Sequence, residues 1–210
     1  MSLTVPVTSI QLAPGSTVTV PNLTWQDFET LLIDRPVNNR SRYTYYQGIL
    51  EIMSPLARHE RPHRIIADLV KAILDSQDRD WEDFGSTTIK RPEIAGIEPD
   101  TCLYIQNAQL VQGCVNLDLA NYPPPDLAIE SDVTSITTIS AYAAVGVPEV
   151  WIYRDSQLTI YIFRSGQYLP SATSPTFPGL DLVTMLPDLV NQSIALGTSK
   201  VLRELRTKLS

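Results

Sequence analysis

Two acidic residues at the ends of expected strands are the residues of this chain best suited to chemistry. Asp100 opens the strand expected in EPDTCLYI, and Glu130 ends the short apolar strand expected in DLAIES. A divalent cation commonly assists phosphodiester hydrolysis by polarising the phosphoryl oxygen and lowering the pKa of the attacking water. Because one or two carboxylates typically hold Mg²⁺, this pair would be a minimal platform for Mg²⁺ or Mn²⁺. The alternative is two ordinary strand-end acids.

Two further positions near these acids carry charges that chemistry could use. Asp126 lies on the same face of its expected strand as Glu130, because side chains alternate along a strand. It is either a third ligand or the polar start of the strand. Lys90 and Arg91 close the expected strand FGSTTIKRP. They would contact a phosphate, steady a metal-bound hydroxide, or remain solvated strand-end cations.

The two histidines of the chain form a second, weaker candidate site. His59 and His63 are four residues apart at the start of an expected helix, a spacing that places both on one face. No third His or Cys stands at a convincing ligand position, so the pattern does not by itself predict zinc. Serine-hydrolase elbows, phosphate-binding glycine loops and paired CxxC motifs are absent from the sequence.

The elements that must position these residues are a mixture of helices and short strands. Apolar periodicity, caps and turn residues predict helices over 24–34, 58–78, from Thr134 or Ser135 to Gly146, and over 191–208. Hairpins are expected at 41–55, turning at Gln47-Gly48, and at 149–164, whereas 106–125 and 165–182 are expected to be irregular. This mixture predicts an α/β fold with a central mixed β-sheet flanked by helices.

Length and composition indicate one globular domain. The 210 residues are expected to form an extended arm over 1–22 and a single domain over 23–210. No apolar run of about 18 residues and no secretory signal are visible, which predicts a cytoplasmic protein outside the membrane. Cys102 and Cys114 are then expected to be reduced thiols. The net charge of −7 counts against strong binding of nucleic acid, although a local basic patch can act against an acidic mean.

An ordered set of sequence blocks resembles the Uma-type family, described as putative restriction endonucleases. The blocks are GILEIMSP with a following His59, GSTTIKR, EPD, PDLAIE and YAAVGVPEVW, in this order, and the match covers about residues 25–165. The resemblance implies a restriction-endonuclease-like PD-(D/E)xK fold and metal-dependent cleavage of nucleic acid, DNA in the first place. It further implies that Asp100 and Glu130 hold Mg²⁺ or Mn²⁺ and that Glu51 is the acid contributed from the earlier region.

The chain departs from the family pattern at the catalytic lysine. A standard motif would place lysine at position 132, which is Asp132, and relatives often carry it four residues before the tyrosine matched by Tyr142, which is Thr138 here. Lysine in such a site stabilises the charge that develops during hydrolysis. Lys90 is the candidate replacement cation.

Three functional hypotheses therefore remain open from the sequence. The first is a metal-dependent endonuclease that uses the two acids, Glu51 and Lys90. The second is a catalytically inactive binding or scaffolding protein that keeps the nuclease fold without the lysine. The third is a protein-interaction domain in which the C-terminal amphipathic helix mediates a homodimer.

Overall fold

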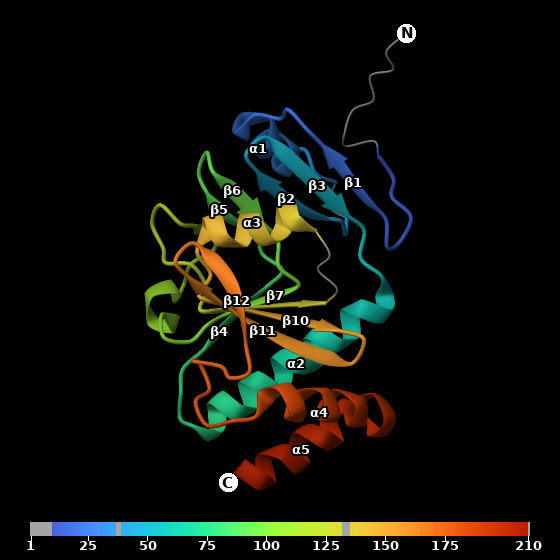
Figure 1. Ribbon diagram of the computed structural model, residues 1–210, viewed down its shortest axis with the longest axis vertical. Helices are drawn as coiled ribbons and strands as arrows, with labels where there is room; N and C mark the ends of the chain where they lie inside the picture. The colour runs from blue at the N-terminus through green and yellow to red at the C-terminus, as the bar shows by residue number, and fades with distance from the viewer. Residues whose placement is uncertain (1–9, 37–38, 132–134, 210) are drawn as a thin grey trace.

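The chain forms two six-stranded mixed sheets with helices between and outside them (Figure 1). The computed structural model describes residues 10–36, 39–131 and 135–209, and their side chains except those of 57–60 and 136–137. The predicted α/β class with a mixed sheet and flanking helices is confirmed. The strands, however, are divided between two sheets, whereas a single central sheet was expected. Within the described ranges no helix has both the length and the apolar character needed to cross a membrane.

The first sheet carries the predicted N-terminal hairpin. Its order is β1 (Thr17–Val20), β3 (Ile49–Met53), β2 (Arg42–Tyr46), β6 (Ala95–Ile97), β5 (Ile89–Arg91) and β8 (Leu117–Asp118). All neighbours are antiparallel except β5 and β8. Gln47 and Gly48 both have positive φ, at 47° and 81°, which is the backbone that a tight hairpin turn requires. The edge strand β1 comes from the segment expected to be an arm and pairs with β3.

The second sheet places an apolar strand at its centre. Its order is β12 (Gln167–Ser171), β11 (Gln157–Arg164), β10 (Glu149–Arg154), β9 (Leu127–Ser131), β7 (Thr101–Tyr104) and β4 (Glu82–Gly85). Strand β9 runs parallel to β10 and antiparallel to β7. All five of its residues are buried because helices cover both faces of the sheet.

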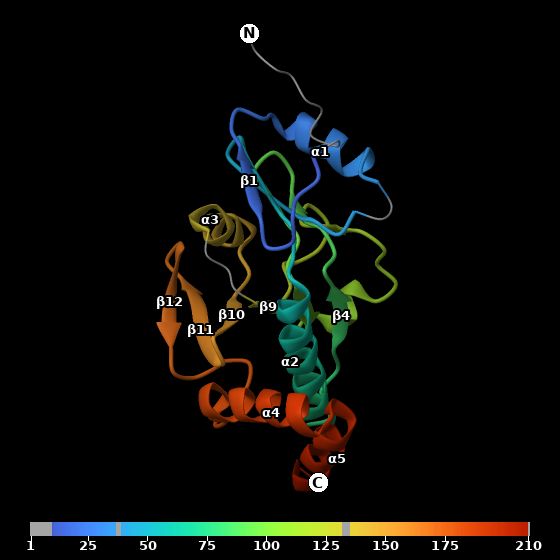
Figure 2. The same ribbon diagram turned by 90° about the vertical axis from the view of Figure 1, so that its right-hand side faces the viewer.

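Alternate residues of β9 enter two different apolar cores. Leu127 and Ile129 pack in the core that contains α2 (Ala57–Ser76), α4 (Leu182–Leu196) and α5 (Thr198–Leu209). Ala128 packs in the core that contains α3 (Ile136–Val145). Figure 2 shows α3 between the two sheets. Helices α4 and α5 lie beneath α2, at the end of the molecule opposite α1. Glu130 shares the α3 side with Ala128, because side chains alternate along the strand.

The helix α1 (Trp25–Ile33) covers the outer face of the first sheet. Thr24 and Asp27 form a capping box at its start, as the sequence pattern predicts. Phe28 packs so close to Gly96 of β6 that a Cβ at position 96 would lie 2.4 Å from its ring. Glycine at position 96 is therefore a condition for seating α1 on this sheet.

Four local expectations were wrong. The terminal helix expected over 191–208 is two helices, interrupted at Gly197 with φ 96°. The segment expected to be irregular after residue 165 contains β12, and the expected loop over 106–125 contains η2 (Ala108–Val111) and β8. The strand expected in FGSTTIKRP is divided between β4 and β5, which belong to different sheets.

Candidate active site

The two predicted acids lie side by side on adjacent antiparallel strands. Thr101 of β7 is paired with Ile129 of β9, so the next step of the register brings Asp100 opposite Glu130. The Asp100 amide donates to Glu130 Oε2 at 3.2 Å, and the Ser131 amide donates to Asp100 Oδ2 at 2.8 Å. Each acid is only 6% exposed. The strand pairing therefore holds two carboxylates in one buried position.

Two basic side chains from other elements approach Asp100. Arg42 of β2 places Nε 3.6 Å from Asp100 Oδ1, and His63 of α2 places Nδ1 3.6 Å from Asp100 Oδ2. Sequence reasoning did not single out Arg42, and it considered His63 only as half of a helical metal pair with His59. The side chain of His59 lies outside the described residues. The site thus combines both sheets and α2, which no local sequence pattern could show.

Tyr142 of α3 completes the surroundings of Glu130. Its hydroxyl donates to Glu130 Oε1, and both residues are buried. Burial, and then the negative charge of Asp100, raise the pKa of Glu130 well above its usual value, while the Tyr142 hydrogen bond opposes the shift. Burial and the neighbouring Glu130 carboxylate raise the pKa of Tyr142 as well. A proton or a cation is therefore favoured at this carboxylate pair.

A cavity of about 340 Å³ lies against Asp100, the first acid of the pair. Its lining includes Asp100, Thr101, Arg42, His63, Asp68 and Asp83. Among the residues whose side chains are described, no group of three or more His, Cys, Asp or Glu residues is arranged to hold a metal ion. The two carboxylates nevertheless fit Mg²⁺, which commonly takes one or two carboxylates and completes its shell with water and substrate oxygen.

Comparisons with known proteins identify the family and the fold of this chain. The model of the Uma-type family, with the description "Putative restriction endonuclease", matches residues 25–197. This chain belongs to that family. A solved structure with the same fold is that of "a putative nuclease belonging to DUF820 from Anabaena variabilis"; it is 14% identical, with a TM-score of 0.55, and the match covers 86% of this chain and 99% of that one. No curated protein matches the sequence.

Glu51, the acid expected from the earlier region of the chain, lies at the start of α3 in this Uma-type protein. Its carboxylate accepts from the Ser135 hydroxyl at 2.6 Å and from the Thr138 hydroxyl at 3.3 Å. Ser135 is the N-cap of α3, so Glu51 also faces the positive end of that helix. Thr138 is the helical position at which the family resemblance leads us to expect lysine. Here a neutral hydroxyl meets Glu51, and Asp132 lies outside the described residues.

Lys90 does not join the carboxylate pair in this arrangement. Its ammonium group binds Glu29 of α1, with Nζ 3.0 Å from Oε1. Arg91 donates to the Ala144 carbonyl at 2.6 Å. The structure thus uses these two strand-end cations to attach helices α1 and α3 to the first sheet.

Asp126 has a structural environment that differs from that of Glu130. Its carboxylate accepts from the Ile105 amide at 2.7 Å, the Asn107 amide at 3.1 Å and Asn107 Nδ2 at 2.9 Å. These neutral donors fasten the segment that follows β7. The interpretation of Asp126 as the polar start of β9 therefore describes its position better than that of a third ligand.

Proposed function

We propose that this protein is a metal-dependent nuclease that hydrolyses phosphodiester bonds in nucleic acid at Asp100 and Glu130. The observation that carries the proposal is the pairing of two buried acids on adjacent strands, one of which, Asp100, lines a cavity together with Arg42 and His63. Membership of the Uma-type family supports the same class of reaction.

Asp100 and Glu130 would hold Mg²⁺ or Mn²⁺. The bound ion supplies charge at the phosphoryl oxygen and lowers the pKa of a water molecule. Glu130 must lose its proton to become a ligand, and its neighbour Tyr142 favours the ionised form by donating to Oε1. The Ser131 amide fixes Asp100 through Oδ2. The strand backbone and α3 therefore orient the two acids before any substrate is bound.

Arg42 would provide the positive charge that lysine provides in the standard motif. Its guanidinium group lies beside Asp100 and lines the same cavity, whereas Lys90 is bound to Glu29. A fixed cation in a buried site stabilises negative charge that develops on a phosphoryl group. His63 would orient Asp100 through Oδ2, whereas Arg42 lies at Oδ1. Glu51 would position water at the N-terminus of α3.

A cleavage assay tests the proposal. Purified protein is incubated with plasmid DNA, single-stranded DNA and RNA, with Mg²⁺, with Mn²⁺ and with EDTA. Cleavage is expected with a divalent ion and should disappear in Asp100→Asn and in Glu130→Gln. The matched control is Glu149→Gln, because Glu149 is a buried acid of the adjacent strand that only Trp151 and Thr176 contact as donors. Metal-independent cleavage, or cleavage by the Asp100 variant, would refute the assignment.

A nuclease-fold protein that binds without cleaving is the second candidate. The hydroxyl of Thr138 where relatives often place an ammonium group favours this function. It predicts that Mg²⁺ binds at Asp100 and Glu130 and that no nucleic acid is cut under any metal condition. Calorimetric Mg²⁺ binding combined with an inactive wild-type protein would identify this candidate.

A further inference from the structure

A large groove beside the carboxylate pair concentrates positive charge in an acidic protein. The groove has a volume of about 1330 Å³, and five arginines line it: Arg35, Arg40, Arg42, Arg61 and Arg64. These are five of the 16 Lys and Arg residues in a chain of net charge −7. Among the residues whose side chains are described, this lining includes two carboxylates, those of Asp68 and Glu98. The groove is therefore basic although the whole protein is acidic.

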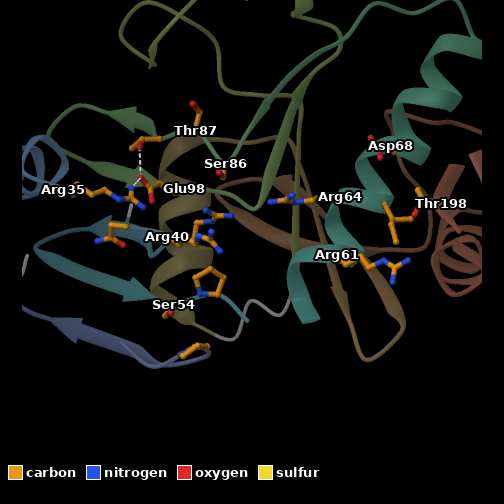
Figure 3. A pocket seen from close by; sticks show the side chains of 16 residues that line it. Arg35, Arg40, Ser54, Arg61, Arg64, Asp68, Ser86, Thr87, Glu98 and Thr198 are labelled. Atoms are coloured by element: carbon orange, nitrogen blue, oxygen red, sulfur yellow. Dashed lines mark hydrogen bonds and ion pairs between the residues drawn. The ribbon is translucent and has the colours of Figure 1, made fainter. Parts of the chain in front are cut away.

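The arginines come from two walls that face each other. Arg40 and Arg42 lie on or next to β2, and Arg61 and Arg64 lie on the first half of α2. Figure 3 shows Arg64 extending from α2 into the groove toward the wall that carries Arg40. Arg40, Arg61 and Arg64 are all exposed. A ligand in the groove would therefore meet guanidinium groups from both sides.

The two acids of the lining are already bound to cations of the protein. Glu98 accepts from Arg35 at 2.6 Å, from the Thr88 hydroxyl at 2.8 Å and from the Tyr43 amide at 2.9 Å. Asp68 lies 2.8 Å from the ammonium group of Lys71. These ion pairs partly neutralise the two carboxylates, so the carboxylates repel a bound anion less. The groove therefore keeps an excess of positive charge.

The remaining polar lining suits phosphate groups. Hydroxyl groups come from Ser54, Ser86, Thr87, Thr88 and Thr198. Arginine, serine and threonine side chains are among the groups that commonly contact nucleic-acid phosphates. An array of this kind, spread along a groove, fits a polyanion with repeating phosphates better than a single small anion.

The groove is continuous with the site at Asp100. The cavity that Asp100 and His63 line shares Arg42, Arg64, Asp68 and Ser86 with the groove. A phosphate backbone lying in the groove would therefore pass directly in front of the carboxylate pair. This relationship connects the basic surface to the chemistry proposed above.

We infer that the groove between β2 and α2 binds the sugar-phosphate backbone of the nucleic-acid substrate, with Arg40 and Arg64 as phosphate contacts outside the catalytic residues, whereas Arg61 donates to the Ser193 carbonyl of α4. The inference rests on the proposed function, because it names how that site receives its substrate. Binding is electrostatic and independent of sequence, so it weakens steeply as salt concentration rises.

Fluorescence anisotropy in EDTA separates binding from cleavage. Labelled 20-nucleotide single-stranded and duplex DNA are titrated with wild-type protein, Arg40→Ala, Arg64→Ala and the double variant at several salt concentrations. Each single change is expected to weaken binding roughly tenfold at low salt. Each should also reduce the slope of log affinity against log salt by about one. Arg164→Ala, an exposed arginine of β11 outside the groove lining, is the matched control.

The outcomes distinguish the groove from the catalytic proposal. Asp100→Asn should bind like the wild type, and the melting temperatures of Arg40→Ala and Arg64→Ala should match that of Arg164→Ala. If these arginine variants bind as tightly as the control, or if the wild type binds no DNA, the groove assignment is wrong, even where cleavage is observed. If the arginine variants lose binding while no protein cleaves, the groove assignment stands and the nuclease proposal fails.

Discussion

The hydroxyl of Tyr142 donates to Glu130 Oε1, which joins the middle of α3 to the end of the central strand β9. This contact links the helix that lies between the sheets to an acid whose pKa is raised well above its usual value by burial and by the charge of Asp100. Because the donor favours the ionised form of Glu130, it lowers the pH at which the pair can accept a cation.

The first prediction concerns Tyr142→Phe. Loss of the donor should raise the pKa of Glu130 further, so Mg²⁺ binding and cleavage should require a higher pH than in the wild type. The measurement is the pH profile of cleavage and of calorimetric Mg²⁺ binding between about pH 5.5 and 9, which covers most of the pH range in which proteins are usually most stable. Tyr161→Phe, a change at a half-buried tyrosine of β11, serves as the control. An unchanged acidic limb would contradict the role of Tyr142.

The second prediction concerns stability in Glu130→Gln. A carboxyl whose folded pKa is raised contributes stability that is present below its unfolded pKa and is lost as pH rises through the folded pKa. Wild-type stability should therefore fall relative to the variant as pH rises from about 4.5 through neutrality. The difference should reach on the order of 1–3 kcal/mol, the usual cost of a poorly compensated buried polar group. Urea unfolding of both proteins across this range measures it, and parallel stability curves would refute the prediction.

The positions of Asp100 and Glu130 could be predicted because each follows a local rule. Residues 127–129 are an apolar run of strand length, and the acid at its end marks the point where the strand leaves the core. Their contact depends on one antiparallel register between β7 and β9, and family resemblance supplied the expectation that these strands are neighbours.

The other members of the site could not be predicted from local patterns. Arg42 belongs to a hairpin of the other sheet, His63 to the long helix and Tyr142 to α3, so their meeting depends on how α3 packs between two sheets. The split into two sheets has no sequence signal of its own. Some errors did have a signal. Gly197 followed by Thr198 and Ser199 is a helix stop followed by a helix start, and Pro170 is compatible with β12 because that strand lies at an edge.

The third prediction concerns metal binding. Mg²⁺ or Mn²⁺ that binds only the folded protein should raise its stability, by about 2.7 kcal/mol at a concentration one hundred times Kd. A thermal melt with and without each ion should therefore show an upward shift in the wild type. The shift should vanish in Asp100→Asn and persist in Asp126→Asn, provided that the second variant folds, because Asp126 binds only main-chain and side-chain amides. An equal shift in the wild type and in Asp100→Asn would place the ion elsewhere.

The fourth prediction concerns Arg42. Arg42→Ala should reduce cleavage by a factor of roughly 10²–10³, the usual effect of removing one transition-state donor, while leaving the fold intact. Arg42→Lys should recover part of the rate, because an ammonium group restores the charge without the guanidinium geometry. The comparison measures kcat separately from KM, since a role limited to substrate binding would raise KM and leave kcat unchanged. Lys90→Ala tests the other cation, and it should keep cleavage because Lys90 binds Glu29.

The final prediction concerns Thr138→Lys, which introduces at position 138 the lysine that the family resemblance implies. Thr138→Lys would place an ammonium group beside Glu51, which at present accepts from the hydroxyls of Thr138 and Ser135. If the missing lysine limits the reaction, this variant should cleave faster than the wild type, and the gain should be lost when Glu51→Gln is added. Thr137→Lys, one position earlier on the helix, is the matched control for adding a charge to α3. A rate unchanged by Thr138→Lys, together with the loss in Arg42→Ala, would show that arginine from β2 already supplies the charge. If Thr138→Lys converts an inactive wild type into an active nuclease, the natural protein is a binding member of the fold that needs only this one cation to cleave.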